Sequence, residues 1–263
     1  MKHKHITNLT LAGIGACLLL RTLQLLVLID GETGFGKVGF TYSGLNLAVY
    51  VLTLLVAVGI VVLSSFFSKR QPVSAPDTTI SPALSVFSFL MAVFNIFTAG
   101  GYLLSGRGIN NHFGLLYLLL LLLSALFFIF YGISGFGSVK CPKILSIAPL
   151  LLSGYELIEA FISYTGMANI SDNVYECLSL CCLLFFFLLH GKVISSVDVR
   201  RSARVILPTS WLTVFFGFLT AVPPLIVALL GGNSLLHHSP LDSIATLFPT
   251  IYALFFTSAL YKN

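Results

Sequence analysis

Charged side chains are scarce in this sequence. They make up 9% of its 263 residues, and the mean hydropathy is +0.99. A soluble domain carries about 25% charged residues, so a chain this apolar cannot keep a wetted surface. Lipid is therefore its natural solvent, and the class of soluble globular proteins is excluded.

The sequence also lacks the patterns that carry most chemistry. It contains no H-E-x-x-H zinc motif, no phosphate-cradling glycine loop after a strand and no paired aspartates in facing spans. Its five cysteines lie in or beside apolar runs, which predicts buried small hydrophobes rather than a disulfide framework or a metal site. We expect no catalytic residue, no metal, no cofactor and no nucleic-acid partner.

One enzyme class stays open as a remote alternative, an intramembrane serine protease. The segment YGISGFG contains G-x-S-G around Ser134, and His190 lies at the same predicted membrane face. Against this class, the rhomboid serine begins a helix that faces outward, whereas Ser134 closes a helix at the cytoplasmic boundary.

Long apolar runs are what the chain has in abundance. A membrane-spanning helix needs about 20 mainly apolar residues. Eight runs meet this requirement, at about 6–28, 43–66, 83–104, 114–134, 144–165, 174–190, 209–231 and 241–260. The segments between them are too short to fold as soluble domains. The sequence therefore predicts an all-α integral membrane bundle of about eight helices, as a single transmembrane domain over residues 1–263.

The placement of lysine and arginine orients the bundle. With the N-terminus inside, eleven of the fourteen fall on inner segments, Lys37 and Arg107 fall on outer loops, and Arg21 falls within a span. This is the asymmetry of the positive-inside rule, so we expect both termini to be cytoplasmic in a multi-pass protein of the cell membrane. The same rule explains the cluster DVRRSAR at 198–204, which could also touch anionic lipid headgroups.

The N-terminus allows a second interpretation. The letters IGAC ending at Cys17 look like a lipoprotein box, but a lipoprotein would continue with a polar tether. This chain continues LLLRTLQLLVLI, so an uncleaved first helix is favoured over lipidation of Cys17.

Arg21 lies roughly 10 Å below the outer surface of the first span. A charge at the membrane centre costs about 2.5–3.5 kcal/mol on insertion scales, so such residues face other helices and find partners. Glu156 and Glu159 share a helix face because they are three residues apart, and they lie at the same depth. We expect Arg21 to pair with Glu159 or Glu156. Gln24 could extend this network, and Glu176 begins the next helix on the outer side.

Prolines in the last two spans lie near the depth of these charges. Pro223, Pro224 and Pro249 each remove a backbone donor. Interrupted spans together with buried charges are typical of transporters. We expect these prolines to break their helices beside a cavity, with ordinary kinking as the alternative.

Two regions resemble a family of small polytopic membrane proteins of anaerobic Gram-positive bacteria. They are LLLRTLQLL…IDGETGFG, with R-x-x-Q followed by a T-G turn, and ELIEAFISY…SDNVYECLSLCCLLFFF, a polar-aromatic fifth helix and the start of the sixth. The family has no assigned function. The resemblance implies only that residues 21–36 and 155–176 hold a shared feature.

Two interpretations of the buried charges stay open. They form either a structural ion pair between the first and fifth helices or a polar cavity open to the outside. Three acids against one base suit cation binding or proton coupling. The leading function is binding or transport of a small polar or ionic solute or a proton. The alternative is a non-transporting membrane sensor or a subunit that docks a partner. Lipid is the one partner that composition itself implies.

Overall fold

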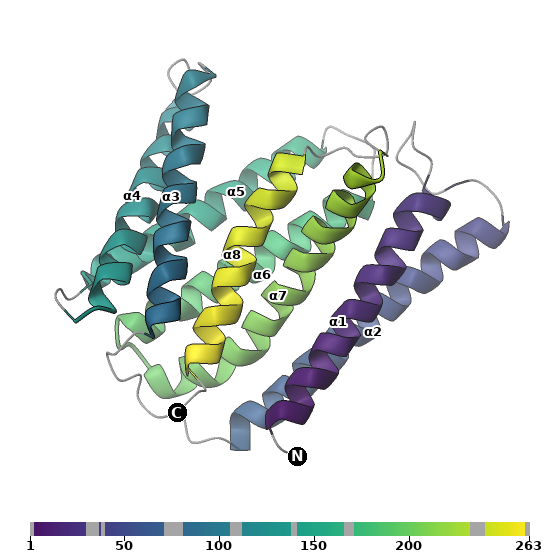
Figure 1. The fold of residues 1–263 in the computed structure, drawn as a ribbon, viewed down its shortest axis with the longest axis horizontal. Helices are drawn as coiled ribbons and strands as arrows, with labels where there is room; N and C mark the ends of the chain where they lie inside the picture. Colours follow the sequence, from purple (N-terminus) through teal and green to yellow (C-terminus); the bar gives the residue numbers. More distant parts are fainter. Residues whose placement is uncertain are drawn as a thin grey trace.

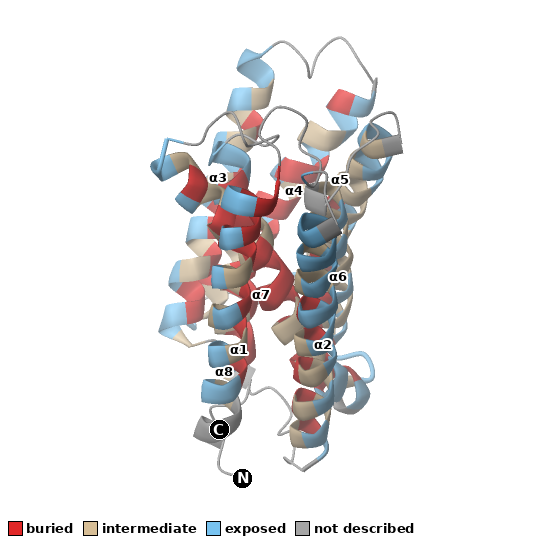
Figure 2. Cartoon of the chain, turned by 90° about the vertical axis from the view of Figure 1, so that its right-hand side faces the viewer, coloured by how far each residue is buried: buried red, intermediate tan, exposed pale blue. Residues whose placement is uncertain are grey.

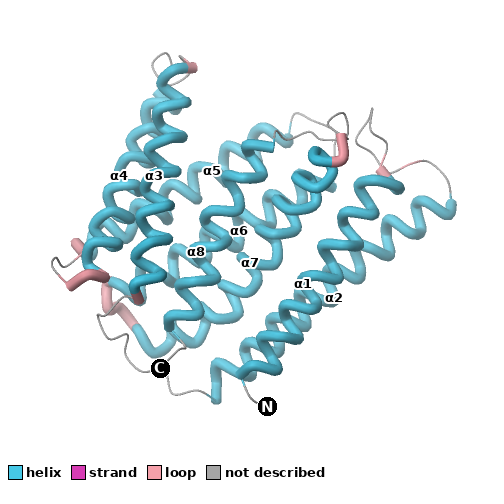
Figure 3. The backbone as a smooth tube through the Cα atoms, in the orientation of Figure 1, coloured by secondary structure: helices cyan, strands magenta, loops and turns pink. Residues whose placement is uncertain are grey.

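The computed structural model describes residues 3–29, 37, 40–70, 81–105, 112–137, 141–165, 171–231 and 240–260. Its α-helices are α1 His3–Leu23, α2 Phe40–Arg70, α3 Pro82–Leu104, α4 His112–Ser134, α5 Ala148–Thr165, α6 Ser171–Ile194, α7 Val199–Leu229 and α8 Pro240–Leu260. A π-helical turn, Gln24–Leu28, continues α1, and a 3-10 turn, Lys143–Ile147, leads into α5. The described residues contain no strand (Figure 3).

Within the described ranges, eight helices are long and apolar enough to cross a membrane, as the sequence predicts. The prediction of an all-α, multi-pass membrane bundle is therefore confirmed. α1 begins and α8 ends at the same end of the bundle (Figure 1). We call this the termini end and the opposite one the far end. The side of the membrane that each end faces stays a prediction.

Several helices extend beyond the apolar runs that predict them. α7 begins at Val199 instead of 209, and α2 reaches Arg70 instead of 66. The α7 extension, VRRSARVILP, begins with a group of arginines, and the α2 extension, FSKR, ends with a lysine and an arginine. A hydropathy window detects only the part of a helix that matches the hydrocarbon core, whereas the backbone hydrogen bonds continue into the headgroup region.

Six of the helices form a closed ring. α3 packs on α4, and the contacts continue through α5, α6, α7 and α8 back to α3. α1 and α2 pack on each other and on α7 from outside this ring (Figure 1). Because α7 contacts both groups, 56% of its apolar stretch is buried, against 22% for α2. Figure 2 shows the buried residues concentrated along α7.

Two aromatic stacks join the first and last helices of the ring. The ring centroids of Phe87 and Phe255 are 3.9 Å apart, and those of Phe94 and Phe248 are 4.6 Å apart. Stacked pairs contribute about 0.5–1.5 kcal/mol beyond the area they bury. We call these two stacks the α3–α8 seam.

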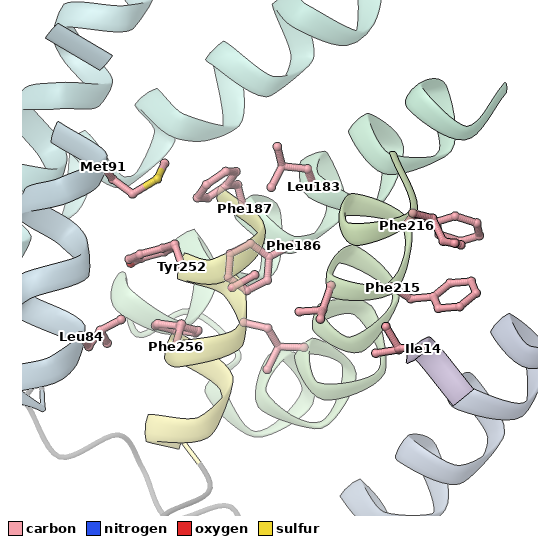
Figure 4. Packing of buried hydrophobic residues seen from close by; sticks show 14 of the residues in the cluster. Ile14, Leu84, Met91, Leu183, Phe186, Phe187, Phe215, Phe216, Tyr252 and Phe256 are labelled. Atoms are coloured by element: carbon pink, nitrogen blue, oxygen red, sulfur yellow. The ribbon is translucent and has the colours of Figure 1, made fainter. Parts of the chain in front are cut away.

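Aromatic side chains of α4, α6 and α8 pack together inside the ring, on the stretch of each helix nearer the termini end; Figure 4 shows four of them, Phe186, Phe187, Tyr252 and Phe256. We call them the aromatic layer: Phe127, Phe128, Tyr131, Phe186, Phe187, Tyr252 and Phe256. His190 lies at the centre of this layer, fully buried, with ring centroids 4.4 to 5.9 Å away. Its Nε2 forms a 2.8 Å hydrogen bond with the Tyr252 hydroxyl.

The α7–α8 contact depends on a missing side chain. A Cβ atom at Gly217 would overlap the Thr250 hydroxyl and lie 2.9 Å from the Thr250 methyl. Small residues let membrane helices approach closely enough to pack. Gly217 therefore sets the distance between α7 and α8.

We predict that Gly217→Ala lowers the free energy of unfolding by about 1–3 kcal/mol, because overpacking forces two helices apart. The Tm in detergent, followed by size-exclusion chromatography, measures this change. The control is Gly59→Ala on α2, where a Cβ meets no atom within 4 Å. Adding Thr250→Ala should restore most of the loss. Equal Tm values for Gly217→Ala and Gly59→Ala would contradict the close approach.

Candidate functional site

A cavity of about 550 Å³ opens inside the ring in its far half. All six ring helices contribute to its wall, and Figure 1 shows α3 and α4 diverging from α8 toward the far end. Its polar and charged lining residues are Asn95, Thr98, Tyr117, Ser124, Ser153, Glu156, Glu159, Ser163, Tyr164, Glu176, Ser179, Thr213, Asp242, Thr246 and Thr250.

Four carboxylates face this cavity, and no lysine or arginine is among the residues described on its wall. Glu156 and Glu159 come from α5, Glu176 from α6 and Asp242 from α8. The three-residue spacing of the α5 pair places both on one helix face, as the sequence predicts. Glu156 interacts electrostatically with Glu159 and with Glu176. The cavity therefore carries a negative potential generated from three sides.

Hydrogen bonds between helices hold the wall in place. The Tyr164 hydroxyl of α5 donates to the Glu176 carboxylate of α6. Across the cavity, the amide of Asn95 on α3 donates to the hydroxyl of Ser124 on α4 over 3.0 Å. Both bonds join neighbouring helices of the ring, so the polar groups are positioned before any ligand arrives.

The carboxylates are spread around the wall rather than gathered at one point. Among the described residues, no three His, Cys, Asp or Glu side chains lie close enough to hold a metal ion together. A desolvated divalent cation requires six or more oxygen ligands at close range. The arrangement suits a ligand large enough to meet several walls at once.

The floor of the cavity belongs to the aromatic layer. Phe128 and Phe187 line the cavity and also pack in that layer. Below them lies the His190–Tyr252 hydrogen bond. The cavity is thus closed toward the termini end by packed rings.

Arg21 lies elsewhere. Within the described part of the chain, the ion pair expected with Glu159 or Glu156 is not formed, so that prediction was wrong. α1 packs on α2 and α7 outside the ring, whereas α5 packs on α4 and α6 within it. Counting residues from the ends of the predicted spans placed these side chains at one membrane depth, but it does not show which helices are neighbours.

The surroundings of Arg21 form a separate polar network. Its Nη1 donates a 2.6 Å hydrogen bond to the side-chain oxygen of Gln24. Its Cζ lies 4.6 Å from the centroid of the Tyr175 ring on α6, a cation–π distance. The Gln24 amide then donates to the Asn46 side chain on α2. Arg21 therefore joins α1 to α2 and α6 and lies behind the cavity wall.

The backbone changes its winding directly after this arginine. Residues Gln24–Leu28 form a π-helical turn, and the Ile29 amide donates to the Gln24 carbonyl over 3.1 Å. The wider turn coincides with the full burial of the Gln24 side chain. A single π-turn at the end of a helix often marks a specialised position, and here it lies beside the Arg21 network.

The prolines do not break their helices. α7 runs without interruption through Pro223 and Pro224, and α8 runs through Pro249. Membrane helices tolerate proline because neighbouring groups compensate for the lost bond. Pro249 does line the cavity, together with Ala245, whose carbonyl it leaves without an intrahelical donor. Pro223 and Pro224 are not part of the lining.

The serine-protease alternative finds no support in the side chains. The Ser134 hydroxyl donates to the carbonyl of Tyr131 over 2.7 Å, within its own helix turn. His190 is enclosed by the aromatic layer and bonded to Tyr252. The two residues are therefore not paired as nucleophile and base.

Sequence reasoning missed two members of the cavity. Asp242 lies in the first turn of α8, where it passes for an ordinary helix-start acid. Asn95 lies in the apolar run of α3. A polar amide inside a span is itself a signal, since such groups normally face other helices.

Comparison of the chain with known protein families, curated proteins and solved structures finds no match in any of the three. The resemblance drawn from residues 21–36 and 155–176 stays a prediction. Its T-G turn at 33–34 lies outside the described residues.

We predict that a cysteine in the cavity reacts preferentially with cationic reagents. In a chain whose native cysteines are replaced, Ser163→Cys should react about tenfold faster with a trimethylammonium thiosulfonate than with a sulfonate analogue, because acidic clefts concentrate cations. Ser105→Cys, exposed at the end of α3, normalises the intrinsic rates. Ser88→Cys, which is fully buried, should not react. Equal normalised rates would contradict an acidic cavity.

We predict that Arg21 serves packing rather than the cavity. Arg21→Met removes the donor to the buried Gln24 side chain and should lower the free energy of unfolding by about 1–3 kcal/mol. The same variant should leave the Ser163→Cys reaction rate unchanged. The control is Lys192→Met, which removes one positive charge from an exposed site on α6. Loss of thiol reactivity without loss of Tm would instead place Arg21 in the cavity.

Proposed function

We propose that this protein binds a small organic cation in the acidic cavity and carries it across the cell membrane. The observation on which the proposal depends is the set of four carboxylates around one 550 Å³ cavity with no basic residue described on its wall. The volume lies in the usual range for small-molecule sites. By the positive-inside rule, the far end and the cavity face outward.

The negative charge of the cavity wall favours a positively charged ligand. Glu156, Glu159, Glu176 and Asp242 concentrate negative potential in a space with low-dielectric walls, which attracts cations and repels anions. Inside a membrane protein such groups mark a substrate or ion pathway.

Aromatic residues indicate an organic cation. Tyr117, Tyr164, Phe94, Phe128 and Phe187 share the wall with the carboxylates. The face of an aromatic ring attracts ammonium and other soft cations within about 6 Å. A fully hydrated inorganic ion would not profit from these faces, whereas an alkyl or aryl ammonium would contact both kinds of group.

The architecture suits transport by alternating access. The cavity opens at the far end, and the aromatic layer closes it toward the termini end. Release on the other side requires the aromatic layer to separate. Two helices that contribute to the layer, α6 and α8, both pack on α7 and have few direct contacts with each other. A cycle in which the aromatic layer opens while the far end of the cavity closes would move the ligand past Phe128 and Phe187.

We predict that the purified protein binds ethidium, and that Glu156→Gln combined with Glu159→Gln weakens binding about 100-fold. Each lost charge contact is assigned about 1.4 kcal/mol, or tenfold in Kd. Fluorescence polarisation measures Kd. Asp198→Asn, an exposed acid at the termini end, is the matched control and should keep the original Kd.

Two further measurements separate binding from transport. An anionic dye of similar size should not bind the unmodified protein, a result that requires no variant to fold. Proteoliposomes loaded with DNA should accumulate ethidium fluorescence only when the protein is present. Absence of ethidium binding overturns the whole proposal. Binding without accumulation overturns the transport step and favours a membrane sensor.

A further inference from the structure

A second depression lies outside the ring, between the termini ends of α2 and α7. It is a groove of about 900 Å³. Its α2 side is formed by Val61, Ser65, Ser68 and Lys69, and its other side by Asp198, Arg201, Arg204, Val205, Pro208, Thr209 and Leu212. We propose that this groove binds a phospholipid with an anionic headgroup.

Three cations lie at the mouth of the groove. Lys69 and Arg201 mark the ends of the apolar stretches of α2 and α7, which is the level of the lipid headgroups. Arg204 follows one turn deeper. All three are exposed. Among the residues described on the wall, Asp198 is the one acid, so these four side chains carry a net charge of +2.

The deeper part of the groove is mainly apolar, with Val61, Val205, Pro208 and Leu212 beside the hydroxyls of Ser65 and Thr209. Val61 precedes Lys69 by eight residues, roughly 12 Å along the helix. Leu212 follows Arg201 by eleven residues, roughly 16 Å. One leaflet of the hydrocarbon core is about 15 Å thick. The groove therefore extends from headgroup level through most of one leaflet, which matches a phospholipid and exceeds a free phosphate.

A proline sets the shape of this groove. Pro208 has no backbone N–H, so the carbonyl of Arg204 lacks its intrahelical donor. The buried hydroxyl of Ser68 on α2 donates to that carbonyl over 2.5 Å. This bond joins α2 to α7 directly between the two walls of the groove.

Anionic lipids are expected in the leaflet that the groove faces. The positive-inside rule places this end at the cytoplasmic leaflet, where anionic lipids create a negative surface potential. Basic pockets between membrane helices at that level bind anionic headgroups. The inference is independent of the cation cavity, which lies inside the ring at the far end.

Native mass spectrometry of the delipidated protein in detergent tests the proposal. We expect dioleoyl phosphatidylglycerol to bind about tenfold more tightly than dioleoyl phosphatidylcholine. Arg201→Gln with Arg204→Gln should weaken the phosphatidylglycerol complex about 25-fold, since each cation near an anionic lipid contributes about fivefold. Lys143→Gln with Lys192→Gln removes two exposed cations at the same end outside the groove and should leave binding unchanged.

Competition identifies the source of the phosphate. Millimolar inorganic phosphate or glycerol 3-phosphate should not displace phosphatidylglycerol, because neither fills the apolar depth of the groove. Displacement by either would overturn the lipid assignment in favour of a soluble anion. Equal affinity for the two lipids, measured on the unmodified protein, would overturn the site itself. An equal loss in the control pair would show a diffuse surface charge instead of a groove.

Discussion

The stacking of Phe87 on Phe255 and of Phe94 on Phe248 holds the first and last helices of the ring together. In lipid, polar groups must be satisfied inside the protein or by water that the protein encloses. If the six helices did not close into a ring, the four carboxylates of the cavity would face acyl chains. Closure at the α3–α8 seam turns them toward one another and makes a charged interior tolerable.

The central position of α7 separates two polar regions that the sequence had suggested were one. On one side of α7, Arg21 binds Gln24 and lies over Tyr175, which fixes the outer pair of helices. On the other side, the carboxylates line a cavity without a basic residue described beside them. The guanidinium and the carboxylates of the cavity therefore lie in two different parts of the structure.

The sequence determines the fold well because one strong rule applies. Hydrocarbon thickness fixes the length of every span, so apolar runs reveal eight helices, and the spacing of Glu156 and Glu159 reveals a shared face. Neighbour relations are different, because they depend on side-chain fit that hydropathy does not encode. Arg21 and Glu159 lie at one depth but in helices that do not touch. Asp242 escaped notice because an acid in a first helical turn has an ordinary explanation.

Local backbone effects were also beyond sequence reasoning. A proline predicts a lost hydrogen bond, yet the outcome depends on what lies opposite. Beside Pro208 the hydroxyl of Ser68 replaces the missing donor, and the helix continues. No rule of spacing pairs residues 68 and 208, because their helices are far apart in sequence and meet only in the folded protein.

The aromatic layer has an electrical consequence. In the proposed orientation the cavity faces the outer solution, so water in it would carry the outer potential down to Phe128 and Phe187. The membrane voltage would then fall mainly across the packed rings around His190 and the protein between them and the termini end. A cation entering the cavity would feel little of that field, while its passage beyond the rings would gain nearly the full 2.3 kcal/mol per charge at 100 mV.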